Sequence, residues 1–431
     1  MPGISELLKI FNLDPQNFSV LSLVWQIIKG WWWLPLPFIL FSVFKFQYLF
    51  FIRKRWDAKI EKILLEIKLP KEVLKPIKAM EYVFAGFHGI HDPTNLREKW
   101  IDGQFQLALS LEIVSIDGEP HFFIRTPVPF RRHIESCIYS QYQEAEISLV
   151  DDYTKYVPQD IPKKGWDLWG ADMITTNENC YPIKTYQQFD EGKEAKEEKR
   201  IDPLSQLLEG MSTLRPGEQL WFQIIAKPII DEIPWTKKGK EIVDKLVRRP
   251  AAKVPRPIVQ EAAEVLIFGP TPAAPEQKEL IPPEMKLTPG ERIIVSAIEE
   301  KIGKFAFDCN IRFVYLGKEE VFFRPNIRIP FGYFKALSTL NLNGLRPLRS
   351  TMTKIMWFLK GRRLFLRKRR MFRYYQKRWI PFFPRGGGTY VLNIEELATL
   401  FHFPGRTVAP APTISRVEAK RSEPPPGLPV E

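Results

Sequence analysis

The stretch FQLALSLEIVSIDGEPHFFIRT, Phe105–Thr126, decides the fold class because it joins two extended runs through a tight turn. Apolar residues dominate both runs, and Asp117 and Gly118 stand between them. Aspartate followed by glycine is the pair that two-residue hairpin turns prefer, since both positions need a positive φ. The stretch therefore predicts a β-hairpin at the centre of a sheet-containing domain.

The segments that follow the hairpin alternate between strand and helix patterns. The helix patterns cover residues 128–142 and 202–214, the latter opened by Asp202 and Pro203, and the strand patterns cover 145–153, 167–176 and 218–229. Hairpin, helix, strand, then strand, helix, strand is the order of a split β-α-β sandwich. Residues 75–248 are therefore predicted to form a ferredoxin-like α+β module.

A second α+β module is predicted at residues 286–405, after a Pro/Ala-rich linker at residues 249–285. A helix capped near Thr288 begins it, and the runs FDCNIRFVYLG and VFFRP read as strands. GTYVLNIEELATLFHFP closes it as a strand and a short helix, and the Pro-rich tail, residues 406–431, is expected to be disordered. The predicted fold class is thus α+β, with two ferredoxin-like modules behind an N-terminal transmembrane helix.

The predicted transmembrane helix is the apolar run at residues 31–52. Its 22 residues would extend about 33 Å, enough to cross a hydrocarbon core of about 30 Å. The candidate anchor residues are the aromatic and basic groups at its two ends, Trp31, Trp32, Trp33, Arg53, Lys54 and Arg55. A docking helix of a soluble protein is the alternative reading of the same run.

The order of charges around this run predicts its orientation. A cleaved signal peptide would place basic residues before the apolar core, whereas here the basic cluster follows it. The positive-inside rule then predicts a single-pass protein of the cell (inner) membrane of a bacterium, with the body from Arg53 onward in the cytoplasm. Residues 1–30 would form an amphipathic segment at the interface. Residues 53–74 would form a juxtamembrane helix that ends at Pro70.

The positive charge of the chain is concentrated in one window. The formal charge is +13, yet residues 321–394 hold 17 Lys or Arg and no acid, so the rest of the chain is net −4 (13 − 17). The centre of this window, residues 350–379, has helical apolar spacing. The candidate anion-binding residues on it are Lys360, Arg362, Arg363, Arg367, Lys368, Arg369, Arg370, Arg373, Lys377 and Arg378. A nucleic-acid backbone, an anionic lipid surface and a solvated structural face remain alternatives for this charge.

Patterns that carry catalysis are missing from the sequence. No Gly-rich phosphate loop followed by Lys and Ser or Thr occurs, and no nucleophile has a local signature. His88 and His91 beside Asp92 resemble a ligand pair only weakly, because no second cluster accompanies them. Cys137, Cys180 and Cys309 lie far apart and are expected to be free thiols. We therefore expect a non-catalytic protein with no cofactor and no metal.

Several stretches resemble a known family, the conjugation-type type IV secretion ATPases of the HerA/FtsK superfamily, in the region before the motor. They are FFIRTPVPFRRHIESCIYSQYQEAEISLVDDYT, AIEEKIGKFAFDCNIRFVYLG, EELATLFHFPG and EPPPGLPVE, and together they span most of residues 75–431. The family usually has Tyr-Pro where this chain has Tyr142-Gln143. In the family a nucleotide-binding domain follows the Pro-rich tail, and this sequence contains no such domain.

The resemblance implies an accessory subunit of a type IV secretion or conjugation-like DNA translocation system. Its partners would be a separate HerA/FtsK-type ATPase, DNA, membrane lipid and other copies of the chain, since the family's motors act as hexameric rings. The alternative is a non-catalytic membrane scaffold in protein secretion or cell-envelope assembly, whose basic helix binds anionic lipid.

Overall fold

The structure, a computed structural model, describes residues 29–30, 35–70, 75–163, 165–189, 202–230, 233–247, 287–356, 359–379 and 388–404. The chain divides into two compact units. The first comprises Met1–Glu61 with Asp92–Gln106, and the second comprises Lys62–His91 with Leu107–Glu431. The predicted interfacial segment up to residue 28, the linker at 249–285 and the tail at 406–431 lie outside the described residues.

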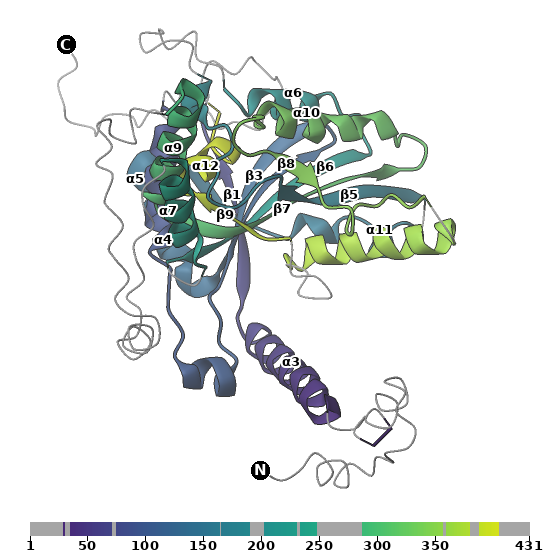
Figure 1. Cartoon of the computed structure of the whole chain (residues 1–431). Coiled ribbons are helices and arrows are strands. Elements are labelled where there is room, and N and C mark those ends of the chain that lie inside the picture. Colours follow the sequence, from purple (N-terminus) through teal and green to yellow (C-terminus); the bar gives the residue numbers. More distant parts are fainter. Residues whose placement is uncertain are drawn as a thin grey trace, which may run out of the picture. The chain divides into compact units, whose positions relative to one another are not determined.

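One antiparallel sheet of nine strands organises the second unit (Figure 1). The strands are β1 (Lys62–Lys68), β2 (Leu109–Ile116), β3 (Glu119–Pro127), β4 (Glu146–Val150), β5 (Trp166–Thr175), β6 (Glu218–Ile229), β7 (Ala306–Lys318), β8 (Leu345–Pro347) and β9 (Tyr390–Asn393). Their order is β4-β1-β3-β2-β6-β7-β5-β8, and β9 also pairs with β7. A mixed helix-and-sheet fold is therefore confirmed.

The predicted hairpin is confirmed as β2 and β3, which pair from Ile116↔Glu119 outward. Its two turn residues, Asp117 and Gly118, have φ of 53° and 91°. Two positive φ values are what a type I′ turn requires, so the residues at this turn fit the conformation that the hairpin needs. The hairpin then lies in the middle of the sheet, between β1 and β6.

Helices cover the two faces of the sheet unequally (Figure 1). The first face packs against α4 (Lys78–His88), α5 (Arg131–Gln141), α6 (Ser205–Ser212), α10 (Arg328–Ala336) and α12 (Ile394–Leu400). The second face packs against α11 (Lys360–Gln376). The helices α7 (Trp235–Leu246) and α9 (Pro289–Ile302) share a smaller core, and a capping box at Thr288 confirms the predicted start of α9.

The prediction of two separate α+β modules is wrong. The strand β7, expected in the second module, pairs with β6 of the first over its whole length, from Glu218↔Gly317 to Ile229↔Ala306. On its other side β7 pairs with β5 and β9. Twelve of the 13 residues of β7 are buried, because neighbouring strands and helices surround it on every side. The strands therefore form one sheet, with β7 in its interior.

The predicted juxtamembrane helix at residues 53–74 is also corrected. A helix, α3 (Pro35–Asp57), continues only to Asp57, and β1 follows as a strand between β3 and β4. Leu64 and Leu65 are both buried, each on its own face of the sheet. A short apolar run buried on both faces has no alternating pattern, so periodicity could not separate strand from helix. The stretch VFFRP is likewise no strand: a 3-10 turn at Arg324–Ile327 leads into α10.

The N-terminal helix differs from the predicted transmembrane span. Its described part, α3, begins at Pro35, so Trp31, Trp32 and Trp33 lie outside the described residues. Arg53, Lys54 and Arg55 belong to its last turns. Within the ranges that the structure describes, no helix combines the length and apolar character needed to cross a membrane.

Candidate functional site

The basic helix α11 is fixed to the second face of the sheet by its apolar side. Met371, Phe372 and Tyr375 are buried there, and the ring of Tyr375 lies 5.0 Å from that of Trp221 on β6. A Cβ at Gly170 of β5 would lie 2.9 Å from Met371 Cγ, so a glycine at this position permits the close approach. The predicted basic helical segment, residues 350–379, is helical only over Lys360–Gln376, because the described residues 350–356 form turns and coil. The cations of the segment can be assigned to two sides.

Arg378, just beyond α11, does not face solvent. Its side chain is 4% exposed, and its Nε and Nη2 donate to the two carboxylate oxygens of Glu112 at 2.9 and 3.0 Å. Asp152 accepts two further hydrogen bonds from the same guanidinium. The prediction that Arg378 binds an external anion is therefore wrong, because carboxylates of the fold already neutralise it.

Glu112 is the centre of this buried cluster. Besides Arg378, it accepts hydrogen bonds from Ser110 at 2.6 Å, Tyr153 at 2.6 Å and Gln223 at 3.1 Å. Burial alone would raise the pKa of Glu112, but the charge of Arg378 and these hydrogen bonds outweigh it and lower the pKa. A carboxylate that is held ionised in this way stabilises the attachment of α11. It carries no proton that it could donate in a reaction.

Three more of the predicted cations also turn toward the body. Lys368 forms an ion pair with Asp167 of β5. Arg367 donates to the backbone carbonyls of Met352 at 3.0 Å and of Lys354 at 3.2 Å. Arg369 is half-buried, and its Nε is buried without a hydrogen-bond partner. Lys368 and Arg367 thus help to position the helix, and all three side chains are less available to a ligand than the exposed cations.

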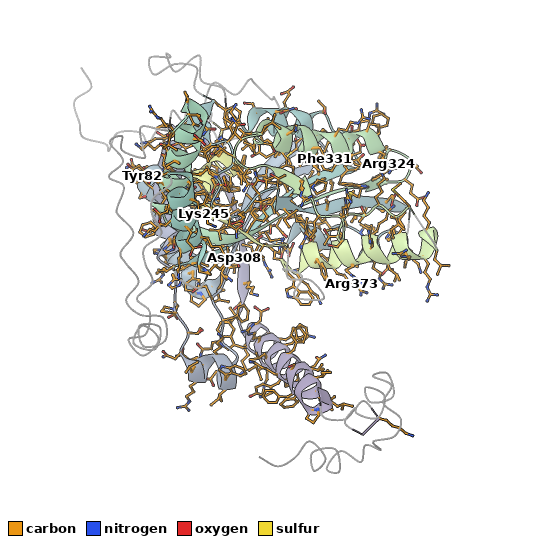
Figure 2. All side chains as sticks on the ribbon, in the orientation of Figure 1. Tyr82, Lys245, Asp308, Arg324, Phe331 and Arg373 are labelled. Carbon is orange, nitrogen blue, oxygen red and sulfur yellow. The ribbon has the colours of Figure 1, made fainter. Side chains whose placement is uncertain are left out.

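The outward side of α11 keeps the other six predicted cations. All six are exposed, and they are Lys360, Arg362, Arg363, Arg370, Arg373 and Lys377. Figure 2 labels Arg373 on this side of the sheet and Arg324 on the opposite side. We call these six residues the α11 basic surface.

Further cations adjoin the α11 basic surface. Lys163 places its Nζ 5.6 Å from the centre of the Phe365 ring, and the exposed Arg349 and Lys354 lie in the loop whose carbonyls hold Arg367. Sequence reasoning missed these three. Arg349 and Lys354 lie in the acid-free window and could have been found from it, whereas Lys163 is about 200 residues away and gives no local signal.

The histidines and cysteines of the described part of the chain do not form a metal site. No three His, Cys, Asp or Glu side chains gather there as metal ligands. His88 stacks on His91 at 6.0 Å, and its Nε2 contacts the carbonyl of Ile229 at 3.1 Å. All three cysteines are free, as predicted. His402, at the end of α12, contacts the Ala398 carbonyl at 2.8 Å and Asp202 at 2.9 Å.

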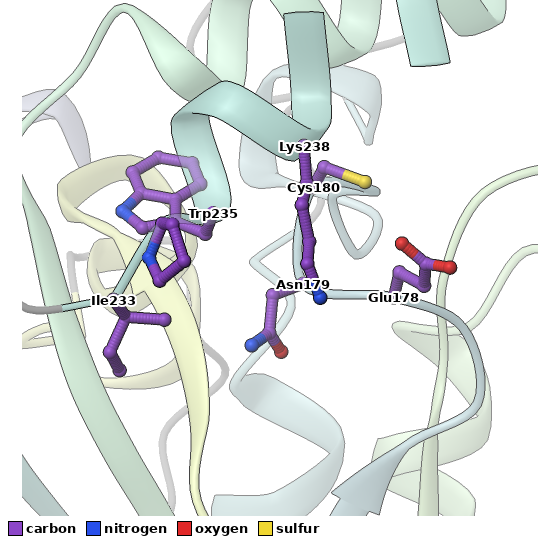
Figure 3. Close-up of a pocket in the computed structure, with 7 residues that line it drawn as sticks. Glu178, Asn179, Cys180, Ile233, Trp235 and Lys238 are labelled. Carbon is purple, nitrogen blue, oxygen red and sulfur yellow. The ribbon is translucent and has the colours of Figure 1, made fainter. Parts of the chain in front are cut away.

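A cavity of about 200 Å³ lies elsewhere, between the loop after β5 and the start of α7 (Figure 3). Its lining residues are Glu178, Asn179, Cys180, Ile233, Pro234, Trp235 and Lys238. Burial raises the pKa of the Cys180 thiol, helped by the nearby Glu178 carboxylate. A thiol of raised pKa stays protonated and is a poor nucleophile, so this cavity does not replace the α11 basic surface as the candidate site.

The fold and the site together define a class: an α+β protein with one broad antiparallel sheet and a basic helix on one face. Residues 66–323 match the family described as a domain of unknown function, DUF8128. This match covers more than half of the chain, and the chain belongs to that family. The matched region ends before α11. No curated protein matches the chain significantly.

Proposed function

We propose that the protein is a non-catalytic, membrane-attached accessory subunit of a type IV secretion or conjugation-like DNA translocation system. In this proposal the α11 basic surface contacts the phosphate backbone of DNA, and a separately encoded HerA/FtsK-type ATPase supplies the motor. The observation that carries the proposal is the row of six exposed cations, five of them on α11 and Lys377 directly after it.

The attachment of α11 to the sheet supports a binding role for its outward cations. The helix is held by the buried cluster of Arg378, Glu112 and Asp152 and by the ion pair of Lys368 with Asp167. A surface that is ordered before binding loses less conformational entropy when a ligand arrives. The inward cations thus fix the helix, and the outward cations are displayed along about 24 Å of its length.

The distribution of carboxylates supports an anionic partner. Three acids that contact α11 or Arg378, namely Glu112, Asp152 and Asp167, are engaged by inward cations. The outward cations lie at helical spacings of three, four and seven residues and repel one another. An approaching polyanion relieves this repulsion and releases its own counterions, which is the main source of sequence-independent affinity for DNA.

Membrane attachment, the partner ATPase and assembly with other copies rest on the sequence. The resemblance to the region before the motor of the secretion ATPases supports the partner and the oligomer. The exposed apolar residues of α3 and the basic cluster Arg53, Lys54 and Arg55 support attachment to the inner membrane, with the body beyond Arg53 on the cytoplasmic side. An adjacent gene for a motor with a phosphate loop is the expected genomic setting.

The test is DNA binding measured by fluorescence anisotropy across a range of salt concentrations. The test variant replaces four exposed cations of α11 (Arg362→Gln, Arg370→Gln, Arg373→Gln, Lys377→Gln). If each contacts one phosphate, the slope of log K against log salt becomes shallower by about 3.6, at 0.9 per contact. The matched control replaces four exposed cations away from α11 (Arg324→Gln, Arg328→Gln, Lys335→Gln, Lys245→Gln) and should keep the original slope.

Two outcomes contradict the DNA role of this surface. Equal DNA affinity in the test variant, the control variant and the unchanged chain would show that α11 does not meet DNA. Loss of binding to anionic vesicles in the test variant, with DNA affinity unchanged, would assign the surface to lipid headgroups instead.

A further inference from the structure

The first unit contains a helix whose apolar residues are mostly uncovered. Ile39, Leu40, Phe41, Val43 and Phe44 of α3 are between 51% and 65% exposed. At about 100° per residue they spread over roughly 200° of the helix circumference. A helix that packs on one protein surface needs an apolar stripe of roughly 100°, so these residues exceed what a single partner face covers. An apolar medium that surrounds the helix, such as the acyl chains of a lipid bilayer, fits this distribution better than one protein surface does.

The second half of α3 is covered along one stripe by the segment Asp92–Gln106, here called the 92–106 loop. Tyr48 donates a hydrogen bond to the carbonyl of Trp100 at 3.0 Å, and Lys45 Nζ lies 4.9 Å from the centre of the Trp100 ring. Farther along the stripe, the ring of Trp56 lies 5.1 Å from that of Phe105. The stripe runs up one side of α3 at helical spacing.

Gly103 fixes the loop closely against α3. Its φ is 73°, and a Cβ there would lie 2.6 Å from the backbone carbonyl of Ile52. Because Gly103, Phe105 and Trp100 contact successive turns of α3, the tip of the loop lies beside Lys45 and Tyr48. The loop therefore follows the helix from Trp56 back toward its apolar half.

The tip of the 92–106 loop displays apolar and basic side chains together. Leu96 is 78% exposed and Ile101 is 64% exposed. Arg97 and Lys99 stand beside them and are exposed too, as is the acidic Asp102, and Glu98 between the two cations is half-buried. Large exposed apolar side chains beside basic groups, close to a tryptophan and a tyrosine, are features of segments that lie at a membrane interface.

We propose that the 92–106 loop is a second lipid-contacting element, and that the headgroup boundary lies at Lys45, Tyr48 and Trp100. This inference rests on the membrane attachment in the proposed function and moves the boundary about two turns before Arg53. The apolar half of α3 enters the hydrocarbon. Its residues Pro35–Phe44 extend about 15 Å, the depth of one leaflet's hydrocarbon.

At that boundary the apolar and the basic side chains of the tip have matching environments. Leu96 and Ile101 enter the upper acyl region, while Arg97 and Lys99 meet anionic headgroups. Lys45, which interrupts the apolar sequence of α3, keeps its ammonium at the headgroup level against the Trp100 ring.

The test uses the full chain with phosphatidylcholine vesicles that contain phosphatidylglycerol. Nitroxide labels are attached at Leu96→Cys, Ile101→Cys and, as the control in the second unit, Leu340→Cys, which is 96% exposed. A Cys137→Ser background removes the partly exposed thiol, since Cys180 and Cys309 are buried. The depth of each label is measured by comparing its accessibility to oxygen, which concentrates in the bilayer, with its accessibility to a water-soluble nickel complex. Labels at positions 96 and 101 should be reached by oxygen, and the label at 340 by nickel.

A binding measurement accompanies the labels. The double variant Leu96→Ser/Ile101→Ser should lower vesicle affinity by at least about tenfold, and Leu340→Ser should leave it unchanged. If the chain floats with vesicles but the labels at 96 and 101 are as nickel-accessible as the label at 340, the loop assignment is overturned while membrane attachment stands. If the unchanged chain does not float, the loop assignment and the proposed membrane attachment both fail. The DNA-binding measurement then still tests the role of the α11 basic surface independently.

Discussion

The two faces of the sheet hold their helices by different physical means. The first face is mainly apolar: Ile311, Phe313 and Tyr315 of β7 point to it and pack among five helices, with a few polar contacts such as that of His402 with Asp202. On the second face the alternate positions of the same strand include Asn310 and Arg312, both fully buried. Burial of apolar area is non-directional, whereas hydrogen bonds and ion pairs require one geometry. On the second face the apolar contacts of α11 are therefore supplemented by directed polar contacts, whereas the helices of the first face are held mainly by apolar burial.

A row of polar side chains crosses the second face. Glu112, Gln223, Arg312 and Asp172 stand in register on the neighbouring strands β2, β6, β7 and β5. All four are fully buried, and Arg312 donates to Asp172 at 2.6 Å and to the carbonyl of Trp379 at 3.1 Å. The row meets the chain just after α11 and gives it a fixed end point.

The largest effect should come from breaking this placement at Arg378. Arg378→Met leaves Glu112 buried without its cation, and we expect a loss of about 3–5 kcal/mol in the free energy of unfolding, measured by urea denaturation. In the double variant Glu112→Gln/Arg378→Met a neutral amide replaces the carboxylate at position 112. No unpaired charge is then buried there, so part of the lost stability should be recovered. If Arg378→Met unfolds at the same urea concentration as the unchanged chain, the directed contacts do not distinguish the second face from the first.

The pH dependence should differ in sign between the two faces. Glu112 and Asp152 are buried, which raises their pKa, but Arg378 more than reverses this. Their stabilisation is complete above the unfolded values of about 4.3 and 3.9 and is lost as pH falls through the lowered folded values. His402, on the first face, is buried, which lowers its pKa, but Asp202 raises it overall. Its stabilisation is complete below about 6.5 and is lost as pH rises through the raised value.

Urea midpoints across pH separate these two contributions. Arg378→Met should flatten the decline on the acid side, and His402→Gln should flatten the decline above neutral pH. Parallel curves for both variants and the unchanged chain would contradict the assignment of these groups.

A smaller effect is expected on the apolar face. Ile224→Val removes one buried methylene between β6 and the helices of the first face, and we expect a loss of about 0.5–1.5 kcal/mol by the same urea measurement. No second substitution should be needed to balance a charge there. A loss in the free energy of unfolding as large as that of Arg378→Met would show that the first face tolerates substitution no better than the second.

The smallest effect on stability should come from the outward side of α11. Replacing Arg362, Arg370, Arg373 and Lys377 by Gln should change the free energy of unfolding by at most about 0.5 kcal/mol per residue, because these side chains are exposed. Thermal denaturation of the variant used for DNA binding checks this directly. A large drop would mean that these cations also hold the helix.

Local signals in the sequence predicted local structure well. The Asp117-Gly118 turn, the run that became β6 and the capping box at Thr288 each carry their own information within a few residues. The joining of β6 to β7 did not follow from any such signal, because pairing between distant strands is decided by the shared core. The run that became β1 was misread as a helix for the reason that both of its faces are buried.

The candidate site shows the same limit. The charge window located α11 and its cations, but arginines five residues apart have opposite roles: Arg373 is exposed and Arg378 is buried. The difference lies in Glu112, which is 266 residues away along the chain from Arg378. Sequence spacing gives the helix, and only the folded sheet supplies the acids that select which cations turn inward.

The position of β7 inside the sheet has a consequence for biosynthesis. When the ribosome has released β6, ending at Ile229, that strand still lacks its neighbour, and β7 begins 77 residues later (306 − 229) at Ala306. Throughout this interval the nascent polypeptide carries an open edge with buried-type residues, which is prone to intermolecular strand addition. A fragment truncated in the intervening segment would carry that edge permanently, so expression trials should keep both halves in one reading frame.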